Sequence, residues 1–341
     1  MIKEIIVLLF GLVSFLAAAA LSYVLLLWLK PLIARHTLAK PNARSSHKVP
    51  TPQGGGIAVI AAVLLVATAG QIVLDREPAE LTRLAIIFAA TVGLALVGAI
   101  DDMRPLDPIP RLVLQFVAVA MVIATLPDQM RIVPFLPWWA DRALVLVGAV
   151  WLVNVVNFMD GIDWMTVVEI VPVAGALGLF GLMGVLPPIA APVALALCGA
   201  MIGFAPFNRP VAQLFLGDVG SLPIGLLLSW LLAMLAGTGY PAAALLLPLY
   251  YLADATVTLL TRLSKGEQIT QAHRSHFYQR ALDGGLSVDR IVASVFAVNV
   301  VLGALALATV CIGSRPVDAA ALAAGGVLVA ALLMKFNRAR S

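Results

Sequence analysis

The chain has 341 residues, of which 62% are hydrophobic and only 12% are charged, and its mean hydropathy is +1.02. Soluble domains of this length carry about twice that share of charged residues, so the composition excludes them and predicts an integral membrane protein. The formal net charge of +4 does not indicate nucleic-acid binding, because the excess of Lys and Arg has a topological explanation.

Eleven apolar runs have about the length needed to cross a bilayer core. The runs at 142–157 and 221–237 are short and carry polar residues at one end, so we expect helices that stop at a site. The sequence predicts an all-α polytopic protein with about 11 transmembrane helices, forming a single membrane-embedded domain over residues 1–341. The runs cover residues 4–28, 55–74, 84–100, 111–126, 142–157, 166–185, 188–206, 221–237, 241–262, 290–312 and 318–335.

The distribution of Lys and Arg predicts the orientation. If the connection at 29–54 is cytoplasmic, most of the 22 Lys and Arg residues fall on the cytoplasmic side. The positive-inside rule then places the N-terminus outside and the C-terminus inside. The longer inner connections also hold nearly all the unusual polar residues, so we expect the active site on the cytoplasmic face.

Five aspartates fall at this predicted inner face, three of them being Asp160, Asp163 and Asp218. The other two, Asp101 and Asp102, end the third run, where the partial negative charge of a helix C-terminus disfavours carboxylates. A solvated turn with Arg104 as the ionic partner is the alternative interpretation. Taken together, five carboxylates at one face predict a metal-dependent enzyme acting on a phosphorylated substrate.

Asn154, Asn157 and Asp160 follow one another at a spacing of three residues near the end of the fifth run. This spacing predicts that all three line one face of a helix. Gly161 then permits a turn that directs Asp163 back toward the site. An Asn-rich helix C-cap is the alternative.

The segment FLGDVGS at 215–221 leads into the eighth run. Ser221 is expected to be the N-cap of that helix, with Pro223 in its first turn. A helix N-terminus favours a phosphate, and Asp218 beside it suits Mg²⁺ or Mn²⁺, which prefer hard oxygen ligands. A Gly-rich turn with an acidic cap is the alternative.

Two inner connections carry basic residues suited to anions. Arg44 and Lys48 precede a Pro- and Gly-rich turn and could clamp an anion, although topology and lipid contact also explain them. In the last inner connection, His273, Arg274 and His276 suit hydrogen bonding to phosphate or sugar, and an amphipathic interfacial helix is the alternative. Zinc is not favoured there, because no Cys accompanies the two histidines.

A cation-coupled transporter is the main rival class, since it also gathers carboxylates within the membrane. Transporters place them near the midplane on broken helices, whereas these aspartates are predicted at helix ends on one face. Asp254 is the exception, because it lies inside the ninth run. It is either functional or a partner for a polar side chain of a neighbouring helix.

In chain order, the segments SSHKVPTPQGGG, GAIDD, NVVNFMDGID and FLGDVGS resemble the polyprenyl-phosphate N-acetylhexosamine-1-phosphate transferases. The resemblance covers about residues 41–290. It implies transfer of a sugar 1-phosphate from a UDP-N-acetylhexosamine to polyprenyl (undecaprenyl) phosphate, with release of UMP. It also implies Mg²⁺ dependence, a bacterial plasma-membrane location, contact with membrane lipids, a homodimer, and a role in starting lipid-linked O-antigen or other cell-wall glycans.

The resemblance assigns catalytic and metal roles to five positions. Asp218 matches the Mg²⁺ ligand, and Asp160 lies in the stretch that contacts the metal and the nucleotide. Asp101 matches the carboxylate that activates the lipid phosphate or belongs to the metal environment, with Asp102 beside it. His276 matches a histidine placed near the diphosphate.

The substrate-binding positions follow in the same way. Asn157 and Asp163 match the nucleotide-contacting stretch, with Asp163 on the uracil side, and Lys48 and Thr51 match a basic loop near the nucleotide. The remaining predicted substrate-binding residues are Arg44, His273 and Arg274.

Two departures from the family pattern bear on the substrate. Trp164 replaces a glycine after the second aspartate of DGID, and HRSHFYQ replaces the triple-histidine loop of the muramoyl-pentapeptide enzymes. A substrate without a peptide is therefore expected. Direct attack by the lipid phosphate is favoured over a covalent phospho-aspartate, because that phosphate is already a nucleophile, but both mechanisms stay open.

Overall fold

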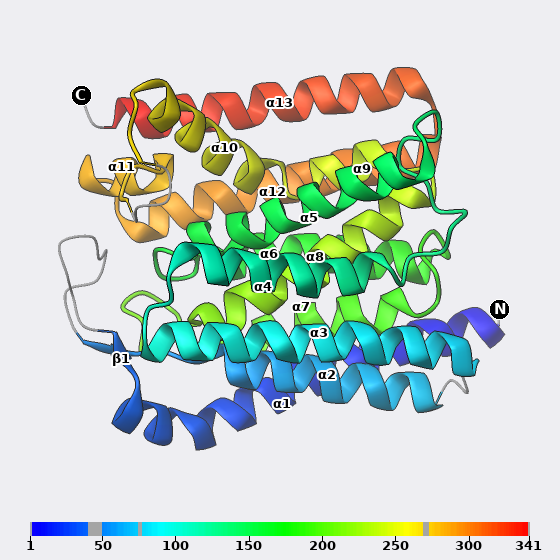
Figure 1. Ribbon diagram of the computed structural model, residues 1–341, viewed down its shortest axis with the longest axis horizontal. Helices are drawn as coiled ribbons and strands as arrows, with labels where there is room; N and C mark the ends of the chain where they lie inside the picture. Colours follow the sequence, from blue (N-terminus) through cyan, green and yellow to red (C-terminus); the bar gives the residue numbers. More distant parts are fainter. Residues whose placement is uncertain (1, 40–49, 74–76, 269–272, 340–341) are drawn as a thin grey trace.

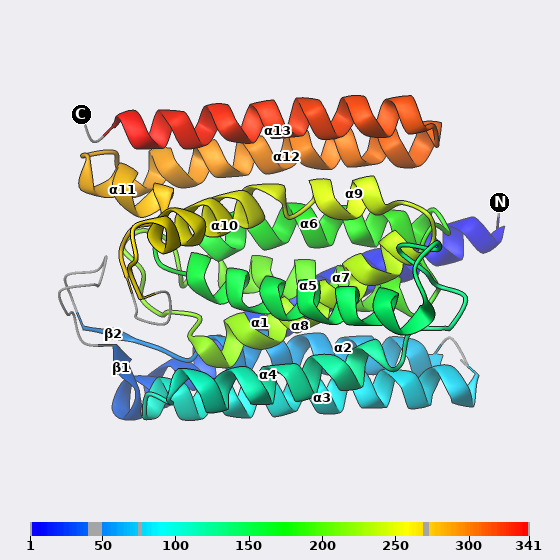
Figure 2. The same ribbon diagram turned by 45° about the horizontal axis from the view of Figure 1, so that its top comes forward.

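The computed structural model describes residues 2–39, 50–73, 77–268 and 273–339, and within these ranges the chain is predominantly helical. The long helices lie side by side along one direction, with connections gathered at the two ends (Figures 1 and 2). The helices are α1 Ile2–His36, α2 Gly56–Val73, α3 Pro78–Met103, α4 Pro108–Ile123, α5 Trp138–Met159, α6 Met165–Leu182, α7 Ala190–Phe204, α8 Asp218–Gly237, α9 Pro241–Leu246, α10 Leu249–Ser264, α11 Phe277–Asp283, α12 Val288–Ile312 and α13 Arg315–Arg338. Two strands, β1 Leu38–Ala39 and β2 Thr51–Pro52, pair antiparallel.

Helix α8 forms the centre of the bundle. Its most apolar window is 100% buried, whereas the corresponding window of α1 is only 22% buried. A helix that is apolar on all sides must be surrounded by other helices, and α2, α3, α5 and α9 contact α8. The apolar side chains left exposed on the outer helices are those of a multi-pass membrane protein.

All eleven predicted apolar runs form helix, but the predicted count of eleven spans stays a prediction. Eight helices in the described ranges are long and apolar enough to cross a membrane. Helices α4 and α7 are shorter, at 16 and 15 residues. The predicted orientation is likewise untested, although α1 begins at one end of the bundle and α13 finishes at the other (Figure 1).

The two runs that looked short belong to longer helices. Helix α5 has 22 residues and α8 has 20, because they begin at Trp138 and Asp218, before the apolar runs start. As expected, α5 ends and α8 begins beside the aspartates. The ninth predicted run is also not continuous. Helix α9 ends at Leu246 and α10 begins after Pro248, because proline has no backbone N–H to donate within a continuous helix.

The N-cap of α8 was also predicted four residues too late. Gly217 is the N-cap and Asp218 is the first helical residue, so Ser221 lies in the first turn and Pro223 lies inside the helix. Gly217 has a φ of 77°, a conformation that glycine adopts without a steric penalty. The early start places the Asp218 carboxylate at the helix N-terminus.

Candidate active site

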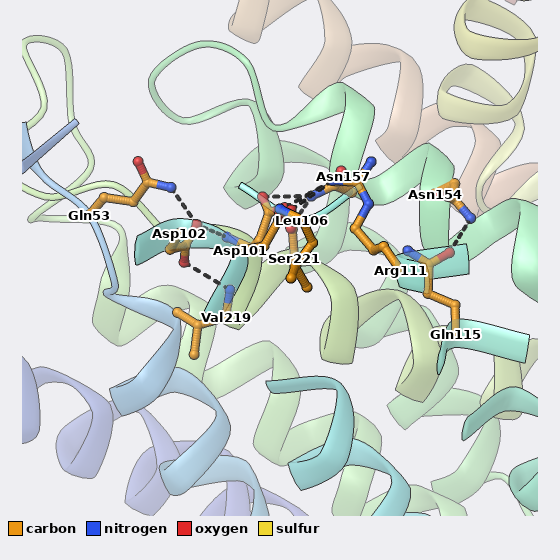
Figure 3. Close-up of polar contacts among 11 residues, drawn as sticks. Gln53, Asp101, Asp102, Leu106, Arg111, Gln115, Asn154, Asn157, Val219 and Ser221 are labelled. Carbon is orange, nitrogen blue, oxygen red and sulfur yellow. Dashed lines mark hydrogen bonds and ion pairs between the residues drawn. The ribbon is translucent and has the colours of Figure 1, made fainter. Parts of the chain in front are cut away.

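Asp102, at the end of α3, caps the N-terminus of α8. Its carboxylate accepts hydrogen bonds from the backbone N–H groups of Asp218 (2.9 Å) and Val219 (3.1 Å). A third bond comes from Gln53 Nε2, at 2.5 Å (Figure 3). The partial positive charge of the α8 N-terminus therefore offsets the unfavourable position of Asp102 at a helix C-terminus.

Asp101, at the end of α3, and Asp218, at the start of α8, lie close enough to contact the same arginine. Arg111 of α4 lies between them, with its Nη1 atom 2.7 Å from Asp101 Oδ2 and 3.6 Å from Asp218 Oδ2. The ionic partner of Asp101 is thus Arg111, and not Arg104 as in the alternative interpretation of a solvated turn. One guanidinium shared by two carboxylates leaves an excess of negative charge.

Asn157 of α5 completes this contact, since its Nδ2 atom donates to Asp218 Oδ1 (2.8 Å) and to Ser221 Oγ (2.9 Å). One turn deeper, Asn154 Nδ2 donates to Gln115 Oε1 of α4 at 2.7 Å (Figure 3). The predicted polar face of α5 therefore exists over Asn154 and Asn157. Its two asparagines bind different helices.

Asp160 does not continue that face as predicted, because α5 ends at Met159 and Asp160 has a non-helical backbone. The Thr166 hydroxyl donates a hydrogen bond to Asp160 Oδ1. Burial raises the pKa of Asp160 to about 6, the Thr166 hydrogen bond opposes that shift, and the neighbouring Asp102 and Asp163 charges add to it. The structure thus groups Asp160 with Asp102 and Asp163, and its predicted metal role stays a prediction.

Gly161 was expected to provide a turn, but its φ is not positive. A side chain there would instead collide with Tyr278, because a Cβ atom would lie 2.1 Å from the Tyr278 hydroxyl. That hydroxyl donates to the Phe158 carbonyl at 3.2 Å. The glycine therefore allows α11 to pack directly on the end of α5.

Asp163 and Trp164 fasten the same turn to the 205–217 segment. Asp163 Oδ2 accepts from the backbone N–H of Ala212 at 3.0 Å. Trp164 donates from its backbone to Asn208 Oδ1 (2.8 Å) and from its indole to the Ala205 carbonyl (2.7 Å). Trp164 has a φ of 64°, a left-handed conformation suited to the glycine that the family pattern has there.

The segment after β2 runs beside the 215–217 segment. The backbone N–H groups of Gly54 and Gly55 donate to the Phe215 carbonyl at 3.1 and 2.9 Å. Thr51 is buried at 5% exposure. The predicted substrate-binding residues Arg44 and Lys48 lie outside the described residues.

The connection between α10 and α11 holds the predicted His273, Arg274 and His276. The two imidazole centroids lie 4.9 Å apart, and His276 Nδ1 lies 3.2 Å from Asp254 Oδ1. Burial lowers the pKa of His273 to about 4, with further lowering by His276 and nearby arginines, so His273 is neutral at pH 7. Arg274 pairs with Asp283 at 2.8 Å.

A cavity of about 250 Å³ lies beside this connection. Four basic and two acidic side chains line it, so its formal charge favours an anion. The lining residues are Thr261, Arg262, Lys265, Glu267, Arg274, Ser275, Arg280 and Asp283.

The facing carboxylates of Asp101 and Asp218 are the donors best suited to Mg²⁺. Within the described residues, no three His, Cys, Asp or Glu side chains lie close enough to hold an ion together. Mg²⁺ does not need such a cage, because it keeps several waters and binds one or two carboxylates plus substrate phosphates. The pair and its excess negative charge therefore fit a hydrated Mg²⁺.

Several residues of this site were not among the sequence predictions. Arg111 had been counted only as a topological charge, and the roles of Gln53 and Thr166 give no local sequence signal because their partners are distant in sequence. Arg111 could have been noticed, since it begins a predicted span directly after the DD motif.

Comparison with known proteins adds an independent observation. Residues 84–236, a little under half of the chain, match the model of the family described as glycosyl transferase family 4. The chain is 28% identical over 337 residues to a decaprenyl-phosphate N-acetylglucosaminephosphotransferase of Mycobacterium tuberculosis, covering 86% of this chain and 80% of that protein.

Two further relatives differ in how much they cover. A probable undecaprenyl-phosphate N-acetylglucosaminyl 1-phosphate transferase of Bacillus subtilis is 22% identical over 281 residues, covering 79% of this chain and 76% of the relative. A phospho-N-acetylmuramoyl-pentapeptide-transferase of Desulfotalea psychrophila is 33% identical over 124 residues, covering 33% of this chain and 31% of the relative. The similarity is thus long for the N-acetylglucosamine enzymes and short for the pentapeptide enzyme.

Proposed function

We propose that this chain, which belongs to the polyprenyl-phosphate N-acetylhexosamine-1-phosphate transferases and is a sugar-phosphate transferase, moves N-acetylglucosamine 1-phosphate from UDP-N-acetylglucosamine to polyprenyl phosphate. UMP is the second product. The choice of sugar follows the relatives whose similarity extends over most of the chain. The product would start a lipid-linked surface glycan at the cytoplasmic face of the plasma membrane.

The pairing of both Asp101 and Asp218 with the single guanidinium of Arg111 is the observation that carries the proposal. The reaction brings together two anions, a lipid phosphate and a nucleotide diphosphate. A bound Mg²⁺ held by Asp218 and Asp101 would neutralise their phosphate oxygens and stabilise the charge that develops during transfer. Arg111, 3.6 Å from Asp218, can pair with a phosphate beside the two carboxylates.

The chemistry is a direct displacement. An oxygen of the lipid phosphate forms a bond to the phosphorus that carries the sugar, and the bond from that phosphorus to the UMP oxygen breaks. Asp101, beside the proposed metal, takes up a proton of the lipid phosphate where one is present. Asp102 suits a positioning role better than the catalytic role predicted for it, because its carboxylate already accepts three hydrogen bonds.

The nucleotide half of the donor is assigned to the turn after α5. Asp163 and Trp164 are hydrogen-bonded to the 205–217 segment, and these bonds fix the conformation of the turn. The base of the nucleotide would therefore meet polar groups that are already held in place. The diphosphate is assigned to the last inner connection, where Arg274 and the anion-favouring cavity lie.

Product formation tests the proposal directly. Purified protein is incubated with undecaprenyl phosphate, Mg²⁺ and a panel of UDP-N-acetylhexosamines, and lipid products are identified by mass spectrometry. A lipid diphosphate–N-acetylglucosamine, with an equal amount of UMP, is the expected result. Folded protein that releases no UMP from any donor would refute the reaction, and product from another donor alone would refute the choice of sugar.

A further inference from the structure

Asp254 of α10 is a fully buried carboxylate surrounded by hydrogen-bonding groups. Three of these groups belong to the start of α11 and two belong to α10. They are His276 Nδ1 (3.2 Å), the backbone N–H groups of Phe277 (3.0 Å) and Tyr278 (3.3 Å), and the hydroxyls of Tyr250 and Thr258 (both 3.3 Å). The sequence left open whether Asp254 is functional or a partner for a polar side chain of a neighbouring helix. In the structure it holds several neighbouring groups in place.

The backbone contacts of Asp254 fix where α11 begins. A carboxylate that accepts from the N–H groups of Phe277 and Tyr278 satisfies donors that a helix N-terminus leaves free. The same oxygen that binds Phe277 also lies 3.2 Å from His276 Nδ1, so the cap and the imidazole share one acceptor. The orientation of His276 therefore depends on Asp254.

The hydrogen-bonding chemistry of this pair also selects one form of the imidazole. A carboxylate only accepts hydrogen bonds, so Nδ1 of His276 carries a proton. The second ring nitrogen, Nε2, is then the one left to interact with another group.

The pair lies against the turn that carries Asp160. The rings of His276 and Phe158 have centroids 6.5 Å apart, and Tyr278, two residues after His276, donates its hydroxyl to the Phe158 carbonyl. Asp160 follows Phe158 by two residues. A carboxylate deep in α10 is thereby linked to the edge of the candidate active site.

We propose that Asp254 is a positioning residue for sugar-phosphate transfer, which holds the His276 imidazole with a proton on Nδ1 and leaves Nε2 to act on the bound diphosphate. This inference rests on the proposed function, because it needs a reaction in which His276 takes part. It adds to the active site a residue that lies outside the aspartate cluster formed by Asp101 and Asp218.

Asp254→Asn is the decisive variant. One carboxylate oxygen of Asp254 serves both Phe277 and His276, so an Asn NH₂ group at that position makes His276 Nδ1 an acceptor and moves the proton to Nε2, while the Asn oxygen keeps only the cap bond to Tyr278. The opposite amide orientation keeps an oxygen toward Nδ1 but replaces the carboxylate by a neutral, weaker acceptor. We expect kcat to fall about 10- to 100-fold, the range found when partners that orient catalytic groups are removed. The KM for the UDP-sugar should change less than threefold.

A double-mutant cycle separates positioning from a purely structural role. In a His276→Gln background, Asp254→Asn should lower kcat by less than twofold, because there is no imidazole left to orient. An equal loss in both backgrounds would overturn the proposal and leave Asp254 as a helix cap alone. Glu169→Gln serves as the matched control. Glu169 is also a carboxylate buried in the membrane region, and it accepts a hydrogen bond from Asn299 at 2.6 Å. It lies on α6 rather than in the connection that carries His273 and His276.

A second measurement does not depend on turnover. The chain has only four histidines, so ¹⁵N NMR of histidine-labelled protein, assigned with His276→Gln, reports the protonated ring nitrogen. Wild type should show Nδ1–H, and Nε2–H in wild type would overturn the proposal. In Asp254→Asn the Nδ1–H signal should weaken in favour of Nε2–H. If wild type released no UMP yet this switch were seen, the proposed reaction would fail while the Asp254–His276 pairing held.

Discussion

Buried carboxylates at the two ends of the bundle differ in how their charge is offset. Asp141 lies at the start of α5, at the end opposite to Asp101 and Asp218, and is fully buried. It accepts from the backbone N–H groups of Ile132 (3.0 Å) and Val133 (2.7 Å) and pairs with Arg131 at 3.4 Å. The negative charge of Asp141 is therefore offset by one arginine and two backbone N–H groups.

The aspartate cluster is built in the opposite way. Asp101 and Asp218 share Arg111, so their charges are not matched one to one. A buried acid is therefore no sign of chemistry in itself, since the Asp141 carboxylate is held by two backbone N–H groups and one arginine. What indicates a functional site is a carboxylate charge that the surrounding chain does not offset.

Asp218→Asn should have the largest effect on activity. The substitution removes one of the two carboxylates proposed to hold Mg²⁺, so we expect transfer to fall by at least about 100-fold, beyond the range for groups that only support a ligand. Thermal stability should stay the same or rise, because the repulsion between Asp101 and Asp218 disappears. UMP release and a melting curve in detergent measure the two effects on one sample.

Near-normal turnover by Asp218→Asn, at any Mg²⁺ concentration, would show that the facing pair is not the metal site. Asn157→Ala is a useful companion variant. It removes a donor to Asp218 while keeping the carboxylate, so its loss of activity should be smaller.

Asp141→Ala should behave in the reverse manner. Breaking a buried ion pair with backbone contacts is expected to cost about 3 kcal/mol of stability. Activity per folded molecule should change by less than about twofold, because the aspartate cluster lies at the other end. If Asp141→Ala instead abolished turnover in folded protein, the contrast between the two ends would be wrong.

The contrast also explains which features the sequence could predict. The helices follow from uninterrupted apolar runs, and the aspartates were expected near one another because each one ends or begins a run on the same predicted side. The role of Asp102 could not be predicted, because its partners are backbone groups of Asp218 and Val219, more than 100 positions away. The break at Pro248 was missed for another reason: hydropathy is continuous across it, and only the backbone geometry of proline interrupts the helix.

Arg111→Gln tests the proposed excess of negative charge by removing the cation instead of a carboxylate. Removing the single shared cation should strengthen Mg²⁺ binding several-fold, because two carboxylates then face each other uncompensated. Turnover at saturating Mg²⁺ should nevertheless fall at least about tenfold, since a charge-assisted contact worth at least about 1.5 kcal/mol to a phosphate is lost. Mg²⁺ titrations of initial rates give both quantities, and weaker Mg²⁺ binding would contradict the assignment.

The smallest effect is expected one turn deeper, where Asn154 binds Gln115. Gln115 is buried at 1% exposure and its Nε2 atom has no partner within the described residues. Asn154→Ala should destabilise the protein by about 1–2 kcal/mol, because it also leaves Gln115 Oε1 without its donor. Gln115→Leu should cost less, because it removes the unpaired Nε2 group, and both variants should keep turnover within about threefold. If either variant lost as much turnover as Arg111→Gln, the residues needed for activity would extend along the contact between α4 and α5 to Asn154 and Gln115. The polar groups without a matching partner would then reach deeper into the bundle.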